Sequence, residues 1–289
     1  MKKIRLKSKA KINLTLEIVK KLHNGFHKIR SVMIKTDSLF DEVELCFLKN
    51  SNKIEIECND PSIPNDEKNI CWKIAEKFFE KTEKRIGLKI KIKKRIPAMA
   101  GLGGGSSNGA VVLLSLNKFF KNTLSENELI DIAAQIGKDI PFFLSKINAA
   151  YVLGEGEKIT PLKNFPKLSL LIINPGGEIS TKEAYSDLDG KMWFMGNQKR
   201  KNISLKLINN SSKIDNFAAF LYNDFDITAE GKFQMIKELK NCLITFGALG
   251  ASLTGKGPTV FGIFKNKKEA LKIKKILNNK YPEFFIELG

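Results

Sequence analysis

The sequence predicts an α+β fold with two lobes, and three observations lead to this prediction. The chain has 289 residues, 43% of them hydrophobic, which is enough for one large core or two smaller ones. From Ile4 to Ile18 the even positions are mostly apolar and the odd positions polar, which is the period of a half-buried strand. A glycine-rich turn at 101–107 runs directly into an apolar helical segment. We place the two lobes at 1–150 and 151–289.

Strands and helices are mixed in both predicted lobes. In the strand that begins at Ile4, Lys11 and Asn13 share one face because side chains alternate between faces. Ser125 and Glu128 form a capping box for a helix that ends at Gly137. The other strands that we expect lie at 42–47, 53–58, 87–93, 149–153, 168–174, 259–264 and 283–288. Further helices are expected at 69–82, 228–246 and 267–279. The polar stretch from Lys191 to Ser212 resembles a mobile insertion.

The composition restricts the class of partner. The formal charge is +18, but only five of the 49 basic residues are arginine, and the lysines are spread over nearly every predicted element. Arginine is favoured for base and phosphate readout, so a scattered lysine excess indicates a solvated surface and no specific nucleic-acid site. The N-terminal stretch has no continuous apolar region and no long apolar run follows, so we expect a soluble, cytoplasmic protein without a membrane partner.

The cysteines and histidines do not suggest a metal site. Cys46, Cys58, Cys71 and Cys242 are far apart in the sequence and form no C-x-x-C pair, and only His23 and His27 could add imidazole ligands. We expect four reduced and mostly buried thiols.

The glycine-rich turn is the main candidate for binding phosphate. Its small residues leave backbone amides free to converge on an anion, and the following helix N-terminus adds partial positive charge. Ser106 and Ser107 add two hydroxyl groups, although a glycine cluster is also compatible with a tight structural turn. A second stretch, Gly250 to Gly257, nearly matches the Walker pattern. It lacks the final Ser or Thr and precedes a strand where a Walker loop would open a helix, so a P-loop fold is excluded.

Three motifs together give the chain a resemblance to a known superfamily. They are PAMAGLGGGSSNGA at 97–110, KINL at 11–14 and LTGKGPT at 253–259. In this order and spacing they resemble the three motifs of the GHMP kinase superfamily. The resemblance implies an N-terminal lobe like ribosomal protein S5 domain 2 and a ferredoxin-like C-terminal lobe, with the active site between them.

Within that superfamily, the chain most resembles the kinases that phosphorylate a cytidine diphosphate-linked methylerythritol in the non-mevalonate isoprenoid pathway. The resemblance covers nearly the whole chain. The supporting segments are SKAKINLTL at 8–16, HNGFH at 23–27, GKDIPFF at 137–143, NPGGEISTKEAY at 174–185 and YNDF at 222–225.

The resemblance implies that Asp139 is the catalytic carboxylate and Lys11 its cationic partner. A carboxylate can orient an alcohol and accept its proton, and an ammonium group offsets charge on the transferred phosphoryl group. Whether Asp139 is a base or an orienting group stays open. Taken alone, Asp139 is typical of a turn and Lys11 of a solvated strand face.

The resemblance also assigns the nucleotide and the substrate. ATP would bind at residues of the glycine-rich and LTGKGPT motifs, with Mg²⁺ held mainly by the ATP phosphates and Ser107 as a candidate ligand. These residues are Pro97, Gly101, Leu102, Gly103, Gly104, Gly105, Ser106, Ser107, Thr254, Gly255 and Gly257. The substrate residues would be Asn13, Phe26, His27, Asp139, Thr181 and Tyr185.

In this family the cytosine lies between two aromatic rings and a histidine reads its polar edge, which assigns these roles to Phe26, Tyr185 and His27. Phe26 stands where the family commonly has tyrosine. Without the resemblance, His27 is typical of a surface histidine and the two aromatic residues of core or rim positions. Two lysines also depart from the family: Lys138 replaces a small residue, and Lys256 interrupts a turn that is usually Gly-Ser-Gly or Gly-Thr-Gly.

Two rival functions stay open at this point. Another GHMP activity, such as a homoserine, mevalonate or sugar kinase, would not need the aromatic pair. A basic, non-catalytic nucleic-acid-binding module would use the ribosomal-type lobe without turning over ATP. The expected assembly is a monomer or a homodimer.

Overall fold

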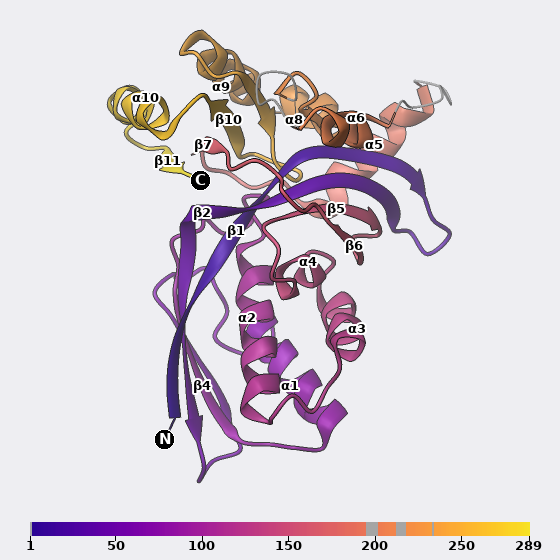
Figure 1. The fold of residues 1–289 in the computed structure, drawn as a ribbon, viewed down its shortest axis with the longest axis vertical. Helices are drawn as coiled ribbons and strands as arrows, with labels where there is room; N and C mark the ends of the chain where they lie inside the picture. Colours follow the sequence, from indigo (N-terminus) through magenta and orange to yellow (C-terminus); the bar gives the residue numbers. More distant parts are fainter. Residues whose placement is uncertain (1, 195–201, 212–217, 233) are drawn as a thin grey trace. The chain divides into compact units, whose positions relative to one another are not determined.

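The chain divides into two compact units that interleave along the sequence (Figure 1). The computed structural model describes residues 2–194, 202–211, 218–232 and 234–289. The first unit consists of Met1–Ala10, Leu39–Ala98 and Gly103–Lys146, and the second of Lys11–Ser38, Met99–Leu102 and Ile147–Gly289. Both units mix helices and strands, which confirms the α+β prediction. A division into domains at residue 150 stays a prediction.

A sheet with helices beside it forms the first unit (Figure 1). Its strand order is β3-β4-β2-β1, with β4 antiparallel to β2 and parallel to β3. The strands are β1 (Lys2–Lys21), β2 (His27–Leu48), β3 (Ile54–Cys58) and β4 (Gly87–Lys93). The helices are α1 (Ile70–Thr82), α2 (Gly104–Phe119), α3 (Glu126–Ile136) and α4 (Ile140–Leu144).

Local sequence signals explain where the helices of the first unit begin. Asn69 caps α1, since its side-chain oxygen accepts a hydrogen bond of 2.8 Å from the backbone N–H of Cys71. The predicted capping box of α3 is present, with Ser125 and Glu128 bonded reciprocally. Buried residues of α1 recur every three or four positions, so one face of this helix packs into the core.

The second unit contains an antiparallel sheet of order β11-β7-β10-β9. Helices α9 (Gln234–Thr245) and α10 (Lys267–Lys280) pack against it. Its strands are β7 (Ser169–Asn174), β9 (Gly250–Leu253), β10 (Val260–Phe264) and β11 (Phe285–Leu288). In the part of the chain that is described, no helix is long and apolar enough to cross a membrane.

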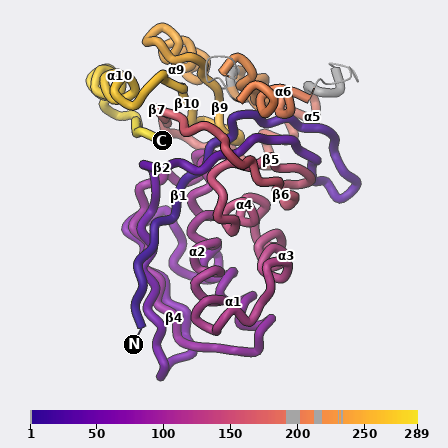
Figure 2. The backbone as a smooth tube through the Cα atoms, viewed as in Figure 1, coloured from indigo at the N-terminus to yellow at the C-terminus, as the bar shows by residue number. Residues whose placement is uncertain are grey.

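The long strands β1 and β2 run through both units, and Figure 2 shows their paths as a continuous tube. Within the second unit they pair with further strands, in the order β8-β1-β2-β5-β6. These strands are β5 (Ala149–Gly154), β6 (Lys158–Pro161) and β8 (Tyr222–Asn223). The remaining helices of this unit include α5 (Thr181–Phe194), α6 (Ile203–Asn209) and α8 (Asp226–Lys232).

The expectation that the first strand is half-buried is wrong from Ala10 to Ile18, where both faces are buried. The polar face of this stretch carries Lys11, Asn13, Thr15 and Glu17, each at most 3% exposed. Buried polar groups need hydrogen-bond partners, and these residues have them. Thr15, for example, accepts from the backbone N–H of Val32 at 2.9 Å. The alternating pattern correctly predicts the strand but does not reveal that its polar face is covered.

The predicted mobile insertion from Lys191 to Ser212 is wrong for the part that forms helix α6. The Glu17 carboxylate accepts hydrogen bonds from the backbone N–H groups of Ile203 and Ser204 and, at 2.6 Å, from the Ser204 hydroxyl. A buried carboxylate therefore binds N–H groups of the first helical turn, and the N-cap residue Asn202 accepts from the N–H of Leu205 at 3.0 Å. Residues 195–201 and 212 lie outside the described residues. The helix expected at 228–246 corresponds to two helices, α8 and α9. Residue 233, between them, also lies outside the described residues.

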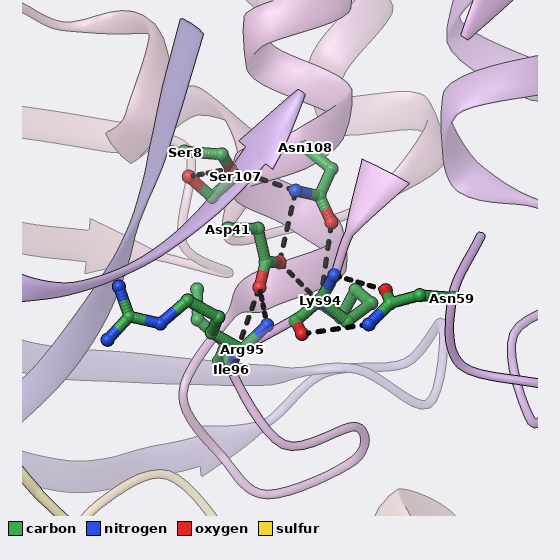
Figure 3. Close-up of polar contacts among 8 residues, drawn as sticks. All are labelled: Ser8, Asp41, Asn59, Lys94, Arg95, Ile96, Ser107 and Asn108. Atoms are coloured by element: carbon green, nitrogen blue, oxygen red, sulfur yellow. Dashed lines mark hydrogen bonds and ion pairs between the residues drawn. The ribbon is translucent and has the colours of Figure 1, made fainter. Parts of the chain in front are cut away.

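A buried carboxylate, Asp41, connects the segment that precedes the glycine-rich turn to strand β2 and helix α2 (Figure 3). Asp41 is 0% exposed and accepts from the backbone N–H groups of Arg95 and Ile96 at 2.8 and 2.9 Å. Its other oxygen accepts from Lys94 Nζ at 2.5 Å and Asn108 Nδ2 at 3.1 Å. These bonds join strand β2, the segment after β4 and helix α2, so Asp41 fixes both sides of the turn.

Replacing Asp41 with asparagine should destabilise the protein by roughly 3 kcal/mol, because a buried pair that loses one partner leaves the other charge uncompensated. Lys94 would be that charge, since its side chain is only 5% exposed. Glu57→Gln is the matched control, since Glu57 forms exposed ion pairs with Lys89 and Lys91 and such pairs contribute about 1 kcal/mol or less. Urea unfolding measures both changes; equal losses of stability would contradict this role of Asp41.

Candidate active site

The glycine-rich turn begins helix α2 in the first unit. Gly103 is the N-cap residue with φ of +69°, and no side chain caps this end of the helix. Gly104 faces Lys94: a Cβ atom at this position would lie 2.9 Å from Lys94 Nζ. Gly105 is exposed and Ser106 half-buried. Backbone N–H groups of the first turn, the helix dipole and a nearby ammonium group therefore combine here, which suits an anion such as phosphate.

The two serines of this turn differ in their surroundings. Ser107 is 2% exposed, and its hydroxyl accepts a hydrogen bond of 2.7 Å from Ser8 (Figure 3). Asn108 donates in turn to Ser8 at 3.0 Å. Ser107 is thus part of the network around Asp41, whereas Ser106 is the more accessible hydroxyl.

In the second unit, segments of all three sequence motifs lie together. The backbone N–H of Lys11 donates to the carbonyl of Leu102 at 2.9 Å. Gly101 lies against the LTGKGPT turn, and a Cβ atom there would collide with the Thr254 carbonyl oxygen. Gly255 likewise lies against the Gly101 backbone: a Cβ atom on Gly255 would lie 2.9 Å from the Cα and the carbonyl oxygen of Gly101. The glycines at these two positions are required because two backbone segments approach closely.

The buried side-chain amide of Asn13 joins Lys11 to the LTGKGPT turn. Its Oδ1 atom accepts from Lys11 Nζ at 2.6 Å and from the backbone N–H of Gly255 at 3.0 Å. Its Nδ2 atom donates to the Ser31 hydroxyl at 2.9 Å. Asn13 therefore orients Lys11, which confirms that these two residues share a strand face. A direct contact of Asn13 with substrate stays a prediction.

Asn223 holds the LTGKGPT turn, and the sequence analysis did not single it out although it lies within the YNDF segment. Its Nδ2 atom donates to the carbonyls of Leu253 and Gly255 at 2.9 and 2.8 Å, and its Oδ1 atom accepts from the Phe225 N–H at 2.9 Å. Asn13 and Asn223 thus hold the same turn from two sides. Only the pairing of β8 with β1 brings Asn223 there, so sequence spacing gives no signal.

Asp139 is the N-cap residue of α4 in the first unit and is half-buried, as is its neighbour Lys138. Lys11 belongs to the second unit. The partnership of Lys11 and Asp139 that the resemblance implies therefore stays a prediction.

The residues predicted to bind cytosine lie in the second unit. The ring of His27 stacks on Tyr185 with centroids 4.5 Å apart, and the Tyr185 ring makes an edge contact with Phe225. Phe26 is 50% exposed. The described structure thus brings His27 and Tyr185 together and presents Phe26 to solvent, while the base sandwich itself stays a prediction.

Asp189 on α5 is a second neighbour of His27 that the sequence analysis did not identify. Its Oδ1 atom lies 2.7 Å from His27 Nε2, and its Oδ2 atom accepts from Lys21 Nζ at 2.7 Å. Burial opposes ionisation of Asp189, but the hydrogen bonds from Lys21 and His27 more than offset it, so the pKa of this carboxyl lies below its usual value.

Thr181, another predicted substrate residue, accepts a hydrogen bond of 2.6 Å from Lys256 Nζ. Burial lowers the pKa of the Lys256 ammonium, and the carboxylate of Glu178 partly opposes this effect. The lysine that departs from the usual turn sequence thus contacts Thr181, at the start of helix α5.

Among the described residues, no group of three His, Cys, Asp or Glu side chains is arranged to hold a metal ion.

Comparison with known proteins identifies the family. The model of the GHMP kinases N terminal domain matches residues 69–146, and that of the GHMP kinases C terminal domain matches residues 209–283. A 4-diphosphocytidyl-2-C-methyl-D-erythritol kinase from Clostridioides difficile (strain 630) is 38% identical over 98% of this chain and 94% of its own length. The chain belongs to the 4-diphosphocytidyl-2-C-methyl-D-erythritol kinase family. It is an ATP-dependent small-molecule kinase with the two-lobed GHMP fold, as the sequence predicts.

Further members of the 4-diphosphocytidyl-2-C-methyl-D-erythritol kinase family support this assignment. The relative from Citrifermentans bemidjiense is 34% identical over 93% of this chain and 92% of its own length. A solved structure, that of a 4-(cytidine 5'-diphospho)-2C-methyl-D-erythritol kinase, has a TM-score of 0.79 at 23% identity and covers 99% of this chain and 98% of its own. At that identity it shows the fold. These relatives do not favour the nucleic-acid-binding alternative.

The close contact between Gly101 and the LTGKGPT turn can be tested by its effect on folding stability. Gly101→Ala should cost about 1–2 kcal/mol for left-handed backbone strain, and roughly 1–3 kcal/mol more for the collision with the Thr254 carbonyl. Gly247→Ala is the matched control, because Gly247 also has positive φ but has no neighbour within 4 Å of its Cβ position. Urea unfolding and ATP binding measure the difference. Equal losses of stability in the two variants would show that the approach at Gly101 is not tight.

Proposed function

We propose that this kinase transfers the γ-phosphoryl group of ATP to the 2-hydroxyl of 4-diphosphocytidyl-2-C-methyl-D-erythritol, in the non-mevalonate pathway of isoprenoid biosynthesis. The observation that most supports this substrate is the stacked pair of His27 and Tyr185, in a chain whose relatives are named for a cytidylyl substrate. A flat aromatic surface beside a hydrogen-bonding histidine suits a pyrimidine base. Homoserine, mevalonate and simple sugars offer no such ring.

In this proposal the glycine-rich turn holds the nucleotide. Residues Gly103 to Ser107 hold the phosphates, through the free first-turn N–H groups before Ser107 and the accessible hydroxyl of Ser106. The Ser107 N–H itself already donates to the Gly103 carbonyl at 2.9 Å. Pro97, Gly101 and Leu102 shape the turn, and Thr254, Gly255 and Gly257 supply the facing loop.

Mg²⁺ would bind mainly to the ATP phosphates and neutralise part of their charge. Ser107 remains the candidate protein ligand, although its hydroxyl already accepts a bond from Ser8.

Asp139 and Lys11 act at the reacting hydroxyl in this proposal. Asp139 orients the alcohol and accepts its proton, and the Lys11 ammonium, held by Asn13, offsets the charge on the transferred group. Phosphoryl transfer depends chiefly on positioning and electrostatics, so a fixed ammonium is worth more than a mobile one.

The substrate residues have matching roles. Phe26 and Tyr185 cover the faces of the cytosine, and His27 reads its polar edge. Asn13 and Thr181 line the pocket for the remainder of the substrate. We place the reaction in the cytoplasm, with the enzyme acting as a monomer or homodimer and with neither nucleic acid nor a membrane as a partner.

The first test is ADP production from Mg·ATP with the cytidylyl compound, mevalonate, homoserine and galactose supplied separately. We expect turnover with the cytidylyl compound alone. Turnover with another alcohol would reject the cytosine pocket but keep the nucleotide site, and no turnover with any of them would reject the proposed function.

Asp139→Asn should lower kcat by a factor on the order of 10²–10⁴ while the fold is retained, because the proton acceptor is lost. Asp131→Asn, at an exposed aspartate of helix α3, is the matched control and should leave kcat unchanged. Steady-state assays and circular dichroism of both variants measure the effect. Near-normal turnover in Asp139→Asn would remove this residue from the mechanism.

A further inference from the structure

His27 is held by two neighbours that constrain its ring in different ways. The imidazole is 7% exposed at the start of β2. Stacking on Tyr185, with 25° between the ring planes, restricts the orientation of the ring plane. The contact of 2.7 Å between Nε2 and Asp189 Oδ1 restricts rotation within that plane. Together these contacts define which edge of the imidazole is left to meet a ligand.

The contact with Asp189 also determines which ring nitrogen carries the proton. Asp189 is ionised near neutral pH, since burial opposes ionisation but the ammonium group of Lys21, 2.7 Å from Oδ2, helps to keep the pKa of this carboxyl below its usual value. A carboxylate only accepts hydrogen bonds, so Nε2 at 2.7 Å must be the N–H donor. In the neutral imidazole the other nitrogen, Nδ1, then has a lone pair and acts as an acceptor.

We infer that Asp189 is a positioning residue that sets base specificity: it holds His27 with its proton on Nε2, so that Nδ1 accepts from an exocyclic amino group of the base. The selected ligand class is a 4-aminopyrimidine nucleotide. A 4-oxo pyrimidine, such as a uridine nucleotide, would place a carbonyl oxygen opposite the Nδ1 lone pair, leaving two acceptors without a hydrogen. This inference rests on the proposed function, since it concerns the base of the proposed substrate.

The opposite arrangement makes the role of Asp189 clear. A histidine with its proton on Nδ1 would donate to the 4-oxo group and so favour uracil over cytosine. The ring alone therefore does not decide between the two bases. The carboxylate on α5 makes that choice through Oδ1, whereas Lys21 binds the other carboxylate oxygen.

The proton position can be measured directly, because the chain has only two histidines, His23 and His27. Long-range proton–nitrogen correlation NMR distinguishes the tautomers, and His23→Gln assigns the remaining signals to His27. We expect Nε2 to be protonated in the otherwise unchanged protein. In Asp189→Leu, which has no acceptor, this preference should be lost. A proton on Nδ1 in the protein with Asp189 intact would overturn the inference.

Base selection is measured with CDP and UDP, titrated separately while the His27 ring signals are followed, so that only binding beside His27 is scored. We expect CDP to bind more tightly than UDP. Asp189→Leu should reduce the ratio of the two affinities roughly tenfold, the effect of about one hydrogen bond. Asp189→Asn keeps an acceptor and should retain part of the ratio. Circular dichroism checks that each variant is folded.

Lys21→Met is the matched control, since Lys21 contacts the same carboxylate through Oδ2, whereas His27 contacts it through Oδ1. It should keep the ratio within about twofold, because Asp189 still accepts from His27. An unchanged ratio in Asp189→Leu would overturn the inference while leaving the kinase and its substrate in place. If neither CDP nor UDP changes the His27 ring signals, and the cytidylyl compound is not turned over, both the inference and the proposed function are rejected.

Discussion

Within the second unit, the two shortest hydrogen bonds that the side-chain oxygen of Asn13 accepts connect Lys11 to the LTGKGPT turn. One comes from the Lys11 ammonium and the other from the backbone of the LTGKGPT turn at Gly255. A buried ammonium and a buried backbone N–H are both costly when unpaired, so this one oxygen satisfies two demanding groups. Asn223 completes the arrangement by binding two carbonyls of the same turn. The position of Lys11 thus depends on a loop that is remote in sequence.

In the first unit, the buried carboxylate of Asp41 positions a glycine-containing segment as Asn13 does in the second unit. It binds the backbone just before the glycine-rich turn and side chains on both sides of it, and Lys94 comes close to Gly104 as a result. In both units, then, a glycine-containing segment is positioned by a buried polar side chain from a different strand. Glycine gives these segments close backbone approach but little rigidity of its own. The buried amide and carboxylate supply that rigidity.

The sequence predicted features that depend on neighbouring residues. The capping box of Ser125 and Glu128, the glycine-rich turn opening α2 and most strands follow from local chemistry. Asp41 and Asp189 were not found, because nothing local separates them from other acidic residues, and only strand pairing and helix packing bring their partners close. The burial of Glu17 was missed for the same reason. The Glu17 carboxylate binds the start of the helix Ile203–Asn209, which lies in the polar stretch that resembles an insertion.

The interleaving of the two units has a consequence for synthesis on the ribosome. The strand segment Lys11–Ser38 emerges early, but most of its unit, Ile147–Gly289, is translated after the whole of the first unit. Thr15 pairs with Tyr222, and Glu17 bonds to Ser204. At typical elongation rates of about 5–20 residues per second, the partners of Thr15 and Glu17 are synthesised on the order of 10 s after them. During that time they are hydrated by water, and completing the second unit requires their dehydration late in translation.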